Sequence, residues 1–193
     1  MIENSNQSSN EEDNLAMAAL AAGDDDALAA IIKRWQGPIT SFLYRTVGEY
    51  DTALDLSQEV FVRLYRNRRA YKTGGKFSSY LFMIASNLAK NHFRWKSRHP
   101  ECHLDSEWGK GVAGDGVSHV DPGAHLERSE KGVQLQQALL SVPEKLRIPV
   151  ILFYYEDYSH TEIAKILKCS RKSVETRIYR ARQILKPLIE AIE

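Results

Sequence analysis

Apolar residues recur at helical spacing along most of this chain. Within residues 51–71, Leu56, Val60 and Leu64 fall on one face, and a second stripe begins at Phe77 and Leu81. No segment alternates apolar and polar residues with the period of two that a strand requires. The pattern therefore predicts an all-α protein.

Helix-start signals divide the pattern into elements. An Asp-rich turn opens the segment 24–47 and suits the positive end of the helix dipole, and Pro38 is expected to interrupt or kink that helix. The sequences SVPE (141–144) and SHTE (159–162) both match a capping box. Because proline is disfavoured inside a helix, Pro149 leads us to expect that the helix after SVPE is kinked or begins late. Ser170 is expected to cap the last helix.

Glycine and charge divide the chain into domains. Residues 99–125 hold five of the eleven glycines and have no apolar period, so we expect a flexible acidic linker there. The linker separates two small helical domains, 15–98 and 126–193, and residues 1–14 are expected to be a disordered acidic tail.

Charge is strongly segregated although the formal net charge is only +1. Residues 63–98 carry ten Lys or Arg and no acid, and residues 158–186 carry eight bases and two acids. Two basic blocks around an acidic connector indicate a polyanion contacted at two places.

The two cysteines, Cys102 and Cys169, stand far apart, which fits a reducing cytoplasm. The chain has neither a signal-peptide-like start nor an apolar run of roughly 20 residues, so we expect a cytoplasmic protein without direct membrane insertion.

A short capped helix, a tight turn and a longer basic helix are typical of a helix-turn-helix. At about 100° per residue, Val174, Ile178, Ala181 and Leu185 share one arc that must face the core. Thr176 and Tyr179 lie opposite, where they would meet base edges. Glu175 and Arg180 flank them, and could pair with a cytosine amine and with guanine respectively. The cations nearer the core edges could reach phosphates.

The acid-free block 63–98 is interleaved with aromatic residues, as single-stranded nucleic acid requires, because cations follow phosphates while rings stack on bases. Phe77 and Tyr65 are expected in the core, whereas Phe93, Arg94 and Trp95 are expected to be exposed. Asn87 and Asn91 on the same helix could hydrogen-bond a flipped-out base. Just upstream lies the segment DLSQEVFVRLY. Its pattern is explained equally well by an ordinary amphipathic helix and by a helix face that docks on a partner protein.

Four segments of the chain, taken in order, resemble the bacterial extracytoplasmic-function (ECF) sigma factors. The segments are AGDDDALAAIIKRW, DLSQEVFVRLYRNRRAY, FSSYLFMIASNLAKNHFRWKSR and SVPEKLRIPVILFYYEDYSHTEIAKILKCSRKSVETRIYRARQILK. The resemblance covers nearly everything except the tail and the linker. It implies regions 2 and 4 of a sigma factor, which binds core RNA polymerase and directs transcription from promoters with −35 and −10 elements. An anti-sigma factor is a further candidate partner.

The resemblance also implies residue roles. The residues expected to dock on core polymerase are Asp55, Gln58, Glu59, Phe61 and Leu64. Those expected to recognise and melt the −10 element are Asn87, Lys90, Asn91, Phe93, Arg94 and Trp95. The expected −35 base contacts are Glu175, Thr176, Tyr179 and Arg180, and the DNA-backbone contacts are Ser170, Arg171, Lys172, Ser173, Arg177 and Arg182. One departure from the family is Lys168, which stands at a turn position that glycine usually suits.

Two other classes of function compete with this interpretation. A stand-alone helix-turn-helix regulator would explain the C-terminal domain but neither the acid-free aromatic block nor the long linker. An enzyme could use a metal held by His99, Cys102 and His103, but these residues lack a zinc-type pair spacing. We therefore expect neither an enzyme nor any metal or cofactor.

Overall fold

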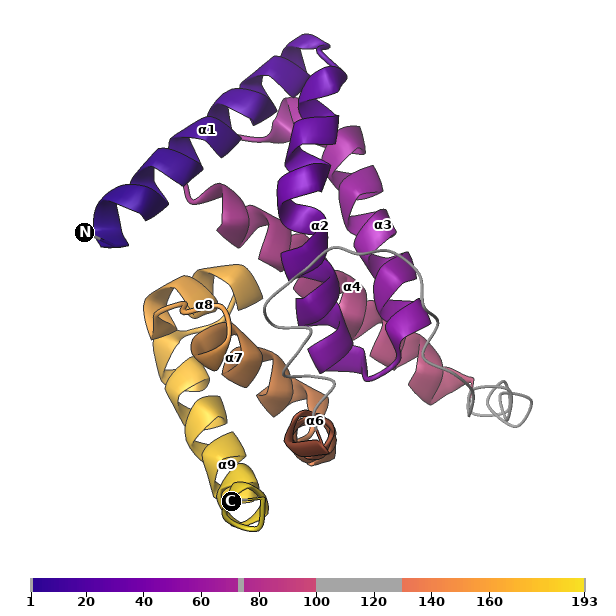
Figure 1. Cartoon of the computed structure of the whole chain (residues 1–193), viewed down its shortest axis with the longest axis vertical. Coiled ribbons are helices and arrows are strands. Elements are labelled where there is room, and N and C mark those ends of the chain that lie inside the picture. The colour runs from indigo at the N-terminus through magenta and orange to yellow at the C-terminus, as the bar shows by residue number, and fades with distance from the viewer. Residues whose placement is uncertain (1, 73–74, 100–129, 193) are drawn as a thin grey trace.

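The computed structural model describes residues 2–72, 75–99 and 130–192. Within those ranges every regular element is helical, which confirms the all-α prediction. The elements are α1 (Ile2–Ala22), α2 (Asp26–Val47), α3 (Tyr50–Arg66), the 3-10 turn η1 (Arg68–Ala70), α4 (Phe77–Arg98), α6 (Glu130–Ser141), α7 (Glu144–Tyr154), α8 (His160–Leu167) and α9 (Arg171–Glu190) (Figure 1).

Helices α1 to α4 form an N-terminal unit in which α2 packs against α1, α3 and α4. Its core holds Phe42, Leu43, Val60, Leu64 and Leu81, all fully buried. These residues stand at helical spacing in the sequence, so each helix turns one apolar face inward. Helix α2 runs continuously through Pro38, so of the two expected outcomes, an interruption or a kink, the interruption is absent.

The structure corrects the expectation of a disordered tail over residues 1–14, because α1 is helical from Ile2 onward. Its polar residues have specific partners in the rest of the unit. Asp13 is 3% exposed and pairs with Arg34 at 2.8 Å, and Asn14 accepts a hydrogen bond from the Tyr71 hydroxyl. An acidic segment is thus ordered through tertiary contacts that its composition does not reveal.

Helices α6 to α9 form a C-terminal unit. Ser159 caps α8 in a capping box with Glu162, and Ser170 caps α9, as expected. The box predicted at SVPE is wrong: the Ser141 hydroxyl instead donates to Ala138 O at the end of α6, and Pro143 stands at the N-cap of α7 without a side-chain cap bond. Helix α7 begins at Glu144, directly after Pro143, and contains Pro149.

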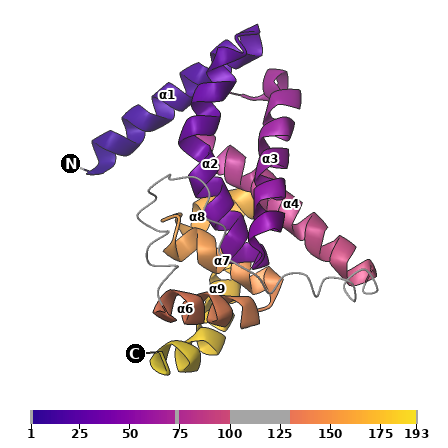
Figure 2. The same ribbon diagram turned by 45° about the vertical axis from the view of Figure 1, so that its right-hand side comes forward.

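The two units pack directly against each other. Helix α2 contacts α6 and α7, and α4 contacts α7 and α8, so one continuous core runs through both units. Figures 1 and 2 show the C-terminal unit beside the lower part of α2, and its contacts with α4 include Ser78 and Phe82 in the first turns of that helix. The sequence analysis treats the units as separate domains, and their direct packing is a finding of the structure. Most of the expected linker, from residue 100 onward, lies outside the described residues.

Candidate nucleic-acid and partner interfaces

The helix-turn-helix is formed by α8, a three-residue turn and α9. Lys168 ends α8 in the left-handed conformation, with φ 52° and ψ 51°, which is why glycine would suit this position. Val174, Ile178, Ala181 and Leu185 are all buried, as the helical wheel predicts. Burial of that arc turns the opposite face of α9 outward.

The expected base-reading residues lie on this outward face. Tyr179 is 64% exposed, and Thr176 and Arg180 are also exposed. Glu175 is half-buried, because Arg171 Nε donates to Glu175 Oε1 at 2.8 Å and His160 Nδ1 lies 4.0 Å from the same oxygen. His160 stacks on Phe153 and so fixes its own ring beside Glu175. The sequence analysis missed His160, because this residue lies on α8 and a helical wheel of α9 includes only residues of α9.

The expected backbone contacts divide by exposure. Arg171, Lys172 and Arg182 are exposed, whereas Ser173 and Arg177 are half-buried. Ser170 Oγ accepts from Ser173 N at 3.2 Å, so in this structure its hydroxyl serves the helix cap. The exposed cations border the base-reading face, an arrangement that suits phosphates on either side of a groove.

The residues expected to act at the −10 element lie on α4 in two groups. Asn91, Arg94 and Trp95 are exposed, and the Arg94 guanidinium donates to Asn91 Oδ1 at 2.9 Å. Trp95 is 48% exposed and stacks on His99, with ring centroids 5.0 Å apart.

Asn87, Lys90 and Phe93 form the second group and are half-buried. Burial, together with the positive charge of Arg177, lowers the pKa of Lys90. Phe77 is fully buried, as expected. Tyr65 is half-buried beneath the Arg68 guanidinium, which lies 4.0 Å from its ring.

The expected docking face lies on α3. Asp55 and Gln58 are exposed, and Glu59 Oε1 accepts from Arg63 Nε at 2.8 Å. Phe61 is 6% exposed and lines a groove of about 440 Å³ between α2 and α3. Leu64 is fully buried, so the structure corrects its expected role as a docking contact: it belongs to the core.

The α2 wall of this groove was missed by sequence reasoning. Leu28 and Ile32 line it from α2, while Val62 and Tyr65 complete it from α3. The docking motif alone could not identify these partners, because they come from a different helix.

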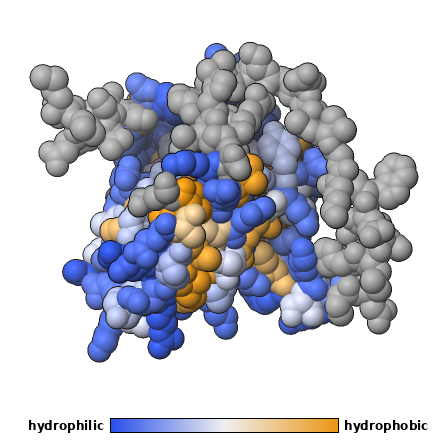
Figure 3. All heavy atoms as spheres, turned by 60° about the horizontal axis from the view of Figure 1, so that its bottom comes forward, coloured by the Kyte–Doolittle hydropathy of each residue, from blue (hydrophilic) through white to orange (hydrophobic). Residues whose placement is uncertain are grey.

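A second groove, of about 650 Å³, lies between α6, α7 and α9. Its lining includes Leu135, Leu139, Tyr154, Tyr179 and Ile189. On the face shown in Figure 3, apolar surface is surrounded by hydrophilic side chains. Tyr179 belongs both to this groove and to the base-reading face, so the two surfaces adjoin.

Of the three residues weighed as metal ligands, Cys102 and His103 lie outside the described residues, and the His99 ring lies on Trp95. Among the described residues no group of three or more His, Cys, Asp or Glu could hold a metal ion. No helix in the described ranges is long and apolar enough to cross a membrane.

An all-α chain with a helix-turn-helix and a second cationic, aromatic surface belongs to the class of helical DNA-binding proteins. Comparison with known families is more specific. Residues 31–99 match the family model for sigma-70 region 2, and residues 132–185 match that for sigma-70 region 4. The first range lies within the N-terminal unit, which also contains α1, and the second lies within the C-terminal unit.

Curated relatives match over nearly the whole chain. The chain is 34% identical over 172 residues to the ECF RNA polymerase sigma factor SigW of Bacillus subtilis, covering 85% of this chain and 89% of the relative. It is 28% identical over 183 residues to the ECF RNA polymerase sigma-E factor of Escherichia coli, covering 93% and 95%. The chain therefore belongs to the ECF sigma factors of RNA polymerase, which direct promoter-specific transcription.

Solved structures share the fold. CnrH in complex with the cytosolic domain of CnrY matches with a TM-score of 0.67 and 23% identity, covering 93% of this chain and 98% of that one. The sigma factor RpoE in complex with the anti-sigma factor NepR from Bartonella quintana matches with a TM-score of 0.62 and 18% identity, covering 86% and 98%.

Proposed function

We propose that this sigma factor divides promoter recognition between two helices. Helix α9 reads the −35 element as duplex DNA, with Thr176, Tyr179 and Arg180 toward the bases. The exposed part of α4, with Asn91, Arg94 and Trp95, takes up the melted −10 strand. The observation that carries the proposal is the division of α9 into a buried apolar arc and an exposed polar one.

Docking on core polymerase is assigned to α3 and the adjoining groove. Asp55, Gln58 and Glu59 supply polar contacts beside the apolar opening at Phe61. An apolar centre with a polar rim is the composition of protein–protein interfaces. Leu64 is left out of the assignment because it is buried.

The protein acts in the cytoplasm as a specificity subunit and not as an enzyme in itself. An anti-sigma factor is a further candidate partner, since the solved relative RpoE is bound to the anti-sigma factor NepR.

The test is transcription from a library of randomised promoters by core polymerase with this protein. We expect the transcripts to select two conserved blocks, one near −35 and one near −10. Tight sequence-specific binding to duplex DNA by the protein alone, with no transcription in the presence of core, would instead identify a stand-alone regulator.

A further inference from the structure

Glu175 differs from the other base-reading candidates on α9 because its carboxylate already has two cationic partners. Arg171 Nε donates to Glu175 Oε1 at 2.8 Å, and His160 Nδ1 lies 4.0 Å from the same oxygen. The Glu175 side chain is nevertheless 43% exposed. A carboxylate offers about four lone-pair sites, so this group can be held from one side and still accept a hydrogen bond from a DNA base.

Arg171 is the less permanent of the two partners. Its side chain is 67% exposed, and it pairs with Glu175 one turn along the same helix, an arrangement that is weak at a protein surface. Arginine also binds phosphate strongly through its forked guanidinium. We therefore expect Arg171 to exchange the carboxylate for a DNA phosphate when α9 enters the groove, which leaves Glu175 Oε1 in need of another donor.

His160 is held in place by contacts outside α9. It is the first residue of α8, where Ser159 Oγ accepts from Glu162 N at 3.3 Å and Ser159 N donates to Glu162 Oε2 at 2.9 Å. Its ring stacks on Phe153 of α7, with centroids 4.8 Å apart and an angle of 15° between the planes. The position of the imidazole beside α9 thus does not depend on DNA.

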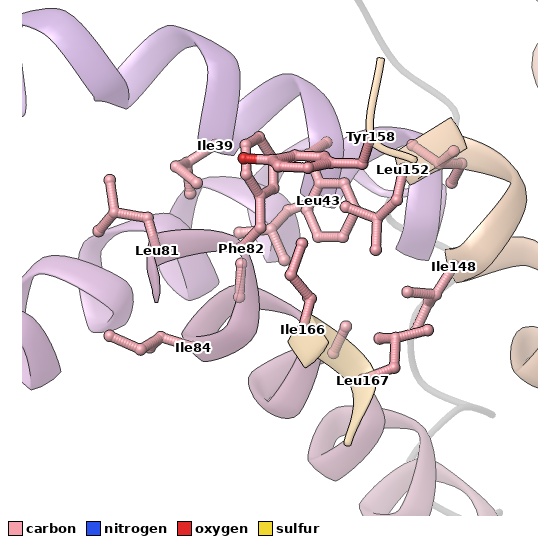
Figure 4. Packing of buried hydrophobic residues seen from close by; sticks show 14 of the residues in the cluster. Ile39, Leu43, Leu81, Phe82, Ile84, Ile148, Leu152, Tyr158, Ile166 and Leu167 are labelled. Atoms are coloured by element: carbon pink, nitrogen blue, oxygen red, sulfur yellow. The ribbon is translucent and has the colours of Figure 1, made fainter. Parts of the chain in front are cut away.

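The helices that carry this stack are fixed by the core. Ile148 and Leu152 of α7 and Ile166 and Leu167 of α8 are all buried (Figure 4). Helix α8 contacts both α7 and α9. Because a protein interior is close-packed, these helices cannot shift independently, so the imidazole stays beside the base-reading face of α9. A side chain locked in this way can orient a neighbouring functional group.

The chemistry of the carboxylate limits which bases it can read. An ionised carboxylate only accepts hydrogen bonds. In the major groove the amines of cytosine N4 and adenine N6 are donors, whereas guanine N7 and O6 and thymine O4 are acceptors that would repel it. A carboxylate that is held in one orientation also loses less side-chain freedom on binding than one that rotates freely. Holding Glu175 should therefore sharpen its preference for a base with an amine.

We propose that His160 is a positioning residue for −35 recognition, which holds Glu175 Oε1 once Arg171 has moved to phosphate. Held in this way, Glu175 accepts from the exocyclic amine of cytosine or adenine at one −35 position. His160 acts through Glu175 and need not touch a base. The proposal rests on the proposed assignment of α9 to the −35 element and adds to it a specificity-determining residue from α8.

Transcription by core polymerase with the full chain, from promoters that carry each of the four bases at every −35 position, tests the proposal. Wild type should prefer cytosine or adenine at one position, and Glu175→Ala should lose that preference. His160→Phe keeps a ring that can stack on Phe153 but lacks Nδ1. It should reduce the preference at the same position by roughly threefold or more, the value of one hydrogen bond, and leave the other positions unchanged.

Three further variants are the controls. In the Glu175→Ala background, His160→Phe should change no base preference further, because the two residues act through one carboxylate. Thr161→Ala, at the exposed residue next to His160 on α8, should keep every preference of the wild type. Arg171→Ala should lower transcription from all −35 sequences about equally, as expected for a phosphate contact.

Wild-type preferences in His160→Phe, a uniform loss at every position, or a further loss in the Glu175→Ala background would each overturn the proposal. It would also be overturned if Glu175→Ala kept all preferences, if the position read by Glu175 favoured guanine or thymine, or if Arg171→Ala alone abolished that preference. If the wild type shows no base preference anywhere in the −35 region, the proposed function of α9 fails instead, so the two failures are distinguishable.

Discussion

Individual side chains on α9 and α4 show how exposure separates two kinds of DNA contact. Tyr179 and Arg180 are exposed on the outer face of α9, and Arg182, one turn beyond Tyr179, lines the apolar groove together with it. A side chain that contacts base edges determines how strongly the protein prefers one DNA sequence over another. A side chain that contacts phosphate changes the affinity for all DNA sequences alike.

Arg180→Ala should reduce discrimination at one −35 position by about 1–3 kcal/mol, because a bidentate arginine–guanine pair is lost. The measurement is transcription with core from −35 variants. Arg182→Ala is the matched control and should weaken all −35 sequences equally. A uniform loss in Arg180→Ala would reassign that residue to phosphate.

Trp95→Ala should slow promoter opening, since stacking on an unpaired base contributes about 1–3 kcal/mol. Trp95 is available for stacking because nearly half of its surface is exposed. Opening is followed on a linear template, and a template with a premelted −10 bubble should largely restore the rate. Unchanged opening of the linear template would remove Trp95 from the melting surface.

At the scale of single helices, α3 and α8 contain interactions between residues three or four positions apart, which the sequence alone can predict. The partly exposed i, i+4 pair Glu59–Arg63 on α3 contributes only about 0.3–0.5 kcal/mol to stability, so Glu59 can exchange this partner for one on another protein at small cost. In α8, the capping box follows from the SHTE spacing alone.

Glu59→Lys should weaken binding to core polymerase by about tenfold or more, because charge reversal places like charges across a docking face. Helical content should stay the same. Glu190→Lys, which reverses an equally spaced exposed pair on α9, is the matched control and should bind core normally. Normal core affinity of Glu59→Lys would exclude Glu59 from the interface.

Lys168→Gly should raise the free energy of unfolding by roughly 0.5–1 kcal/mol, since Lys168 is held at φ 52°, where glycine has no side-chain clash. Urea denaturation measures the change. Lys165→Gly in the last turn of α8 should instead destabilise the protein, because glycine is a poor helix former. A fall in stability for Lys168→Gly would show that the lysine side chain matters more than the backbone.

For the whole molecule, contacts between the units link stability to pH. Burial alone would raise the pKa of Glu162, but hydrogen bonds from Ser159 and Lys76 outweigh it and lower the pKa below the ordinary value of 4.5. A lowered carboxyl pKa stabilises the folded chain above pH 4.5, and that contribution is lost as the pH falls below it.

Lys76→Met should therefore reduce the loss of stability between pH 7 and pH 4, because it removes one of the interactions that favour ionised Glu162. Urea titrations at both pH values measure this difference. Arg69→Met, at an exposed site on η1, should leave the acid-induced loss as in the wild type. Identical acid-induced losses in all three proteins would exclude the ion pair as a source of pH dependence.

The sequence by itself determined the helical class, the capping of α8 and α9, and which face of α9 is buried. These features depend on residues within a few positions of one another, so periodicity and cap spacing are sufficient to predict them. The family resemblance likewise rests on local motifs, and the comparisons confirm it.

Only the tertiary structure decided that Leu64 is core, that α1 is anchored through Asp13 and Asn14, and that Tyr158 and Arg147 join the two units. Each of these contacts joins side chains that are distant in sequence. Their partners are chosen by packing and by the need to satisfy buried polar groups, which no local pattern encodes.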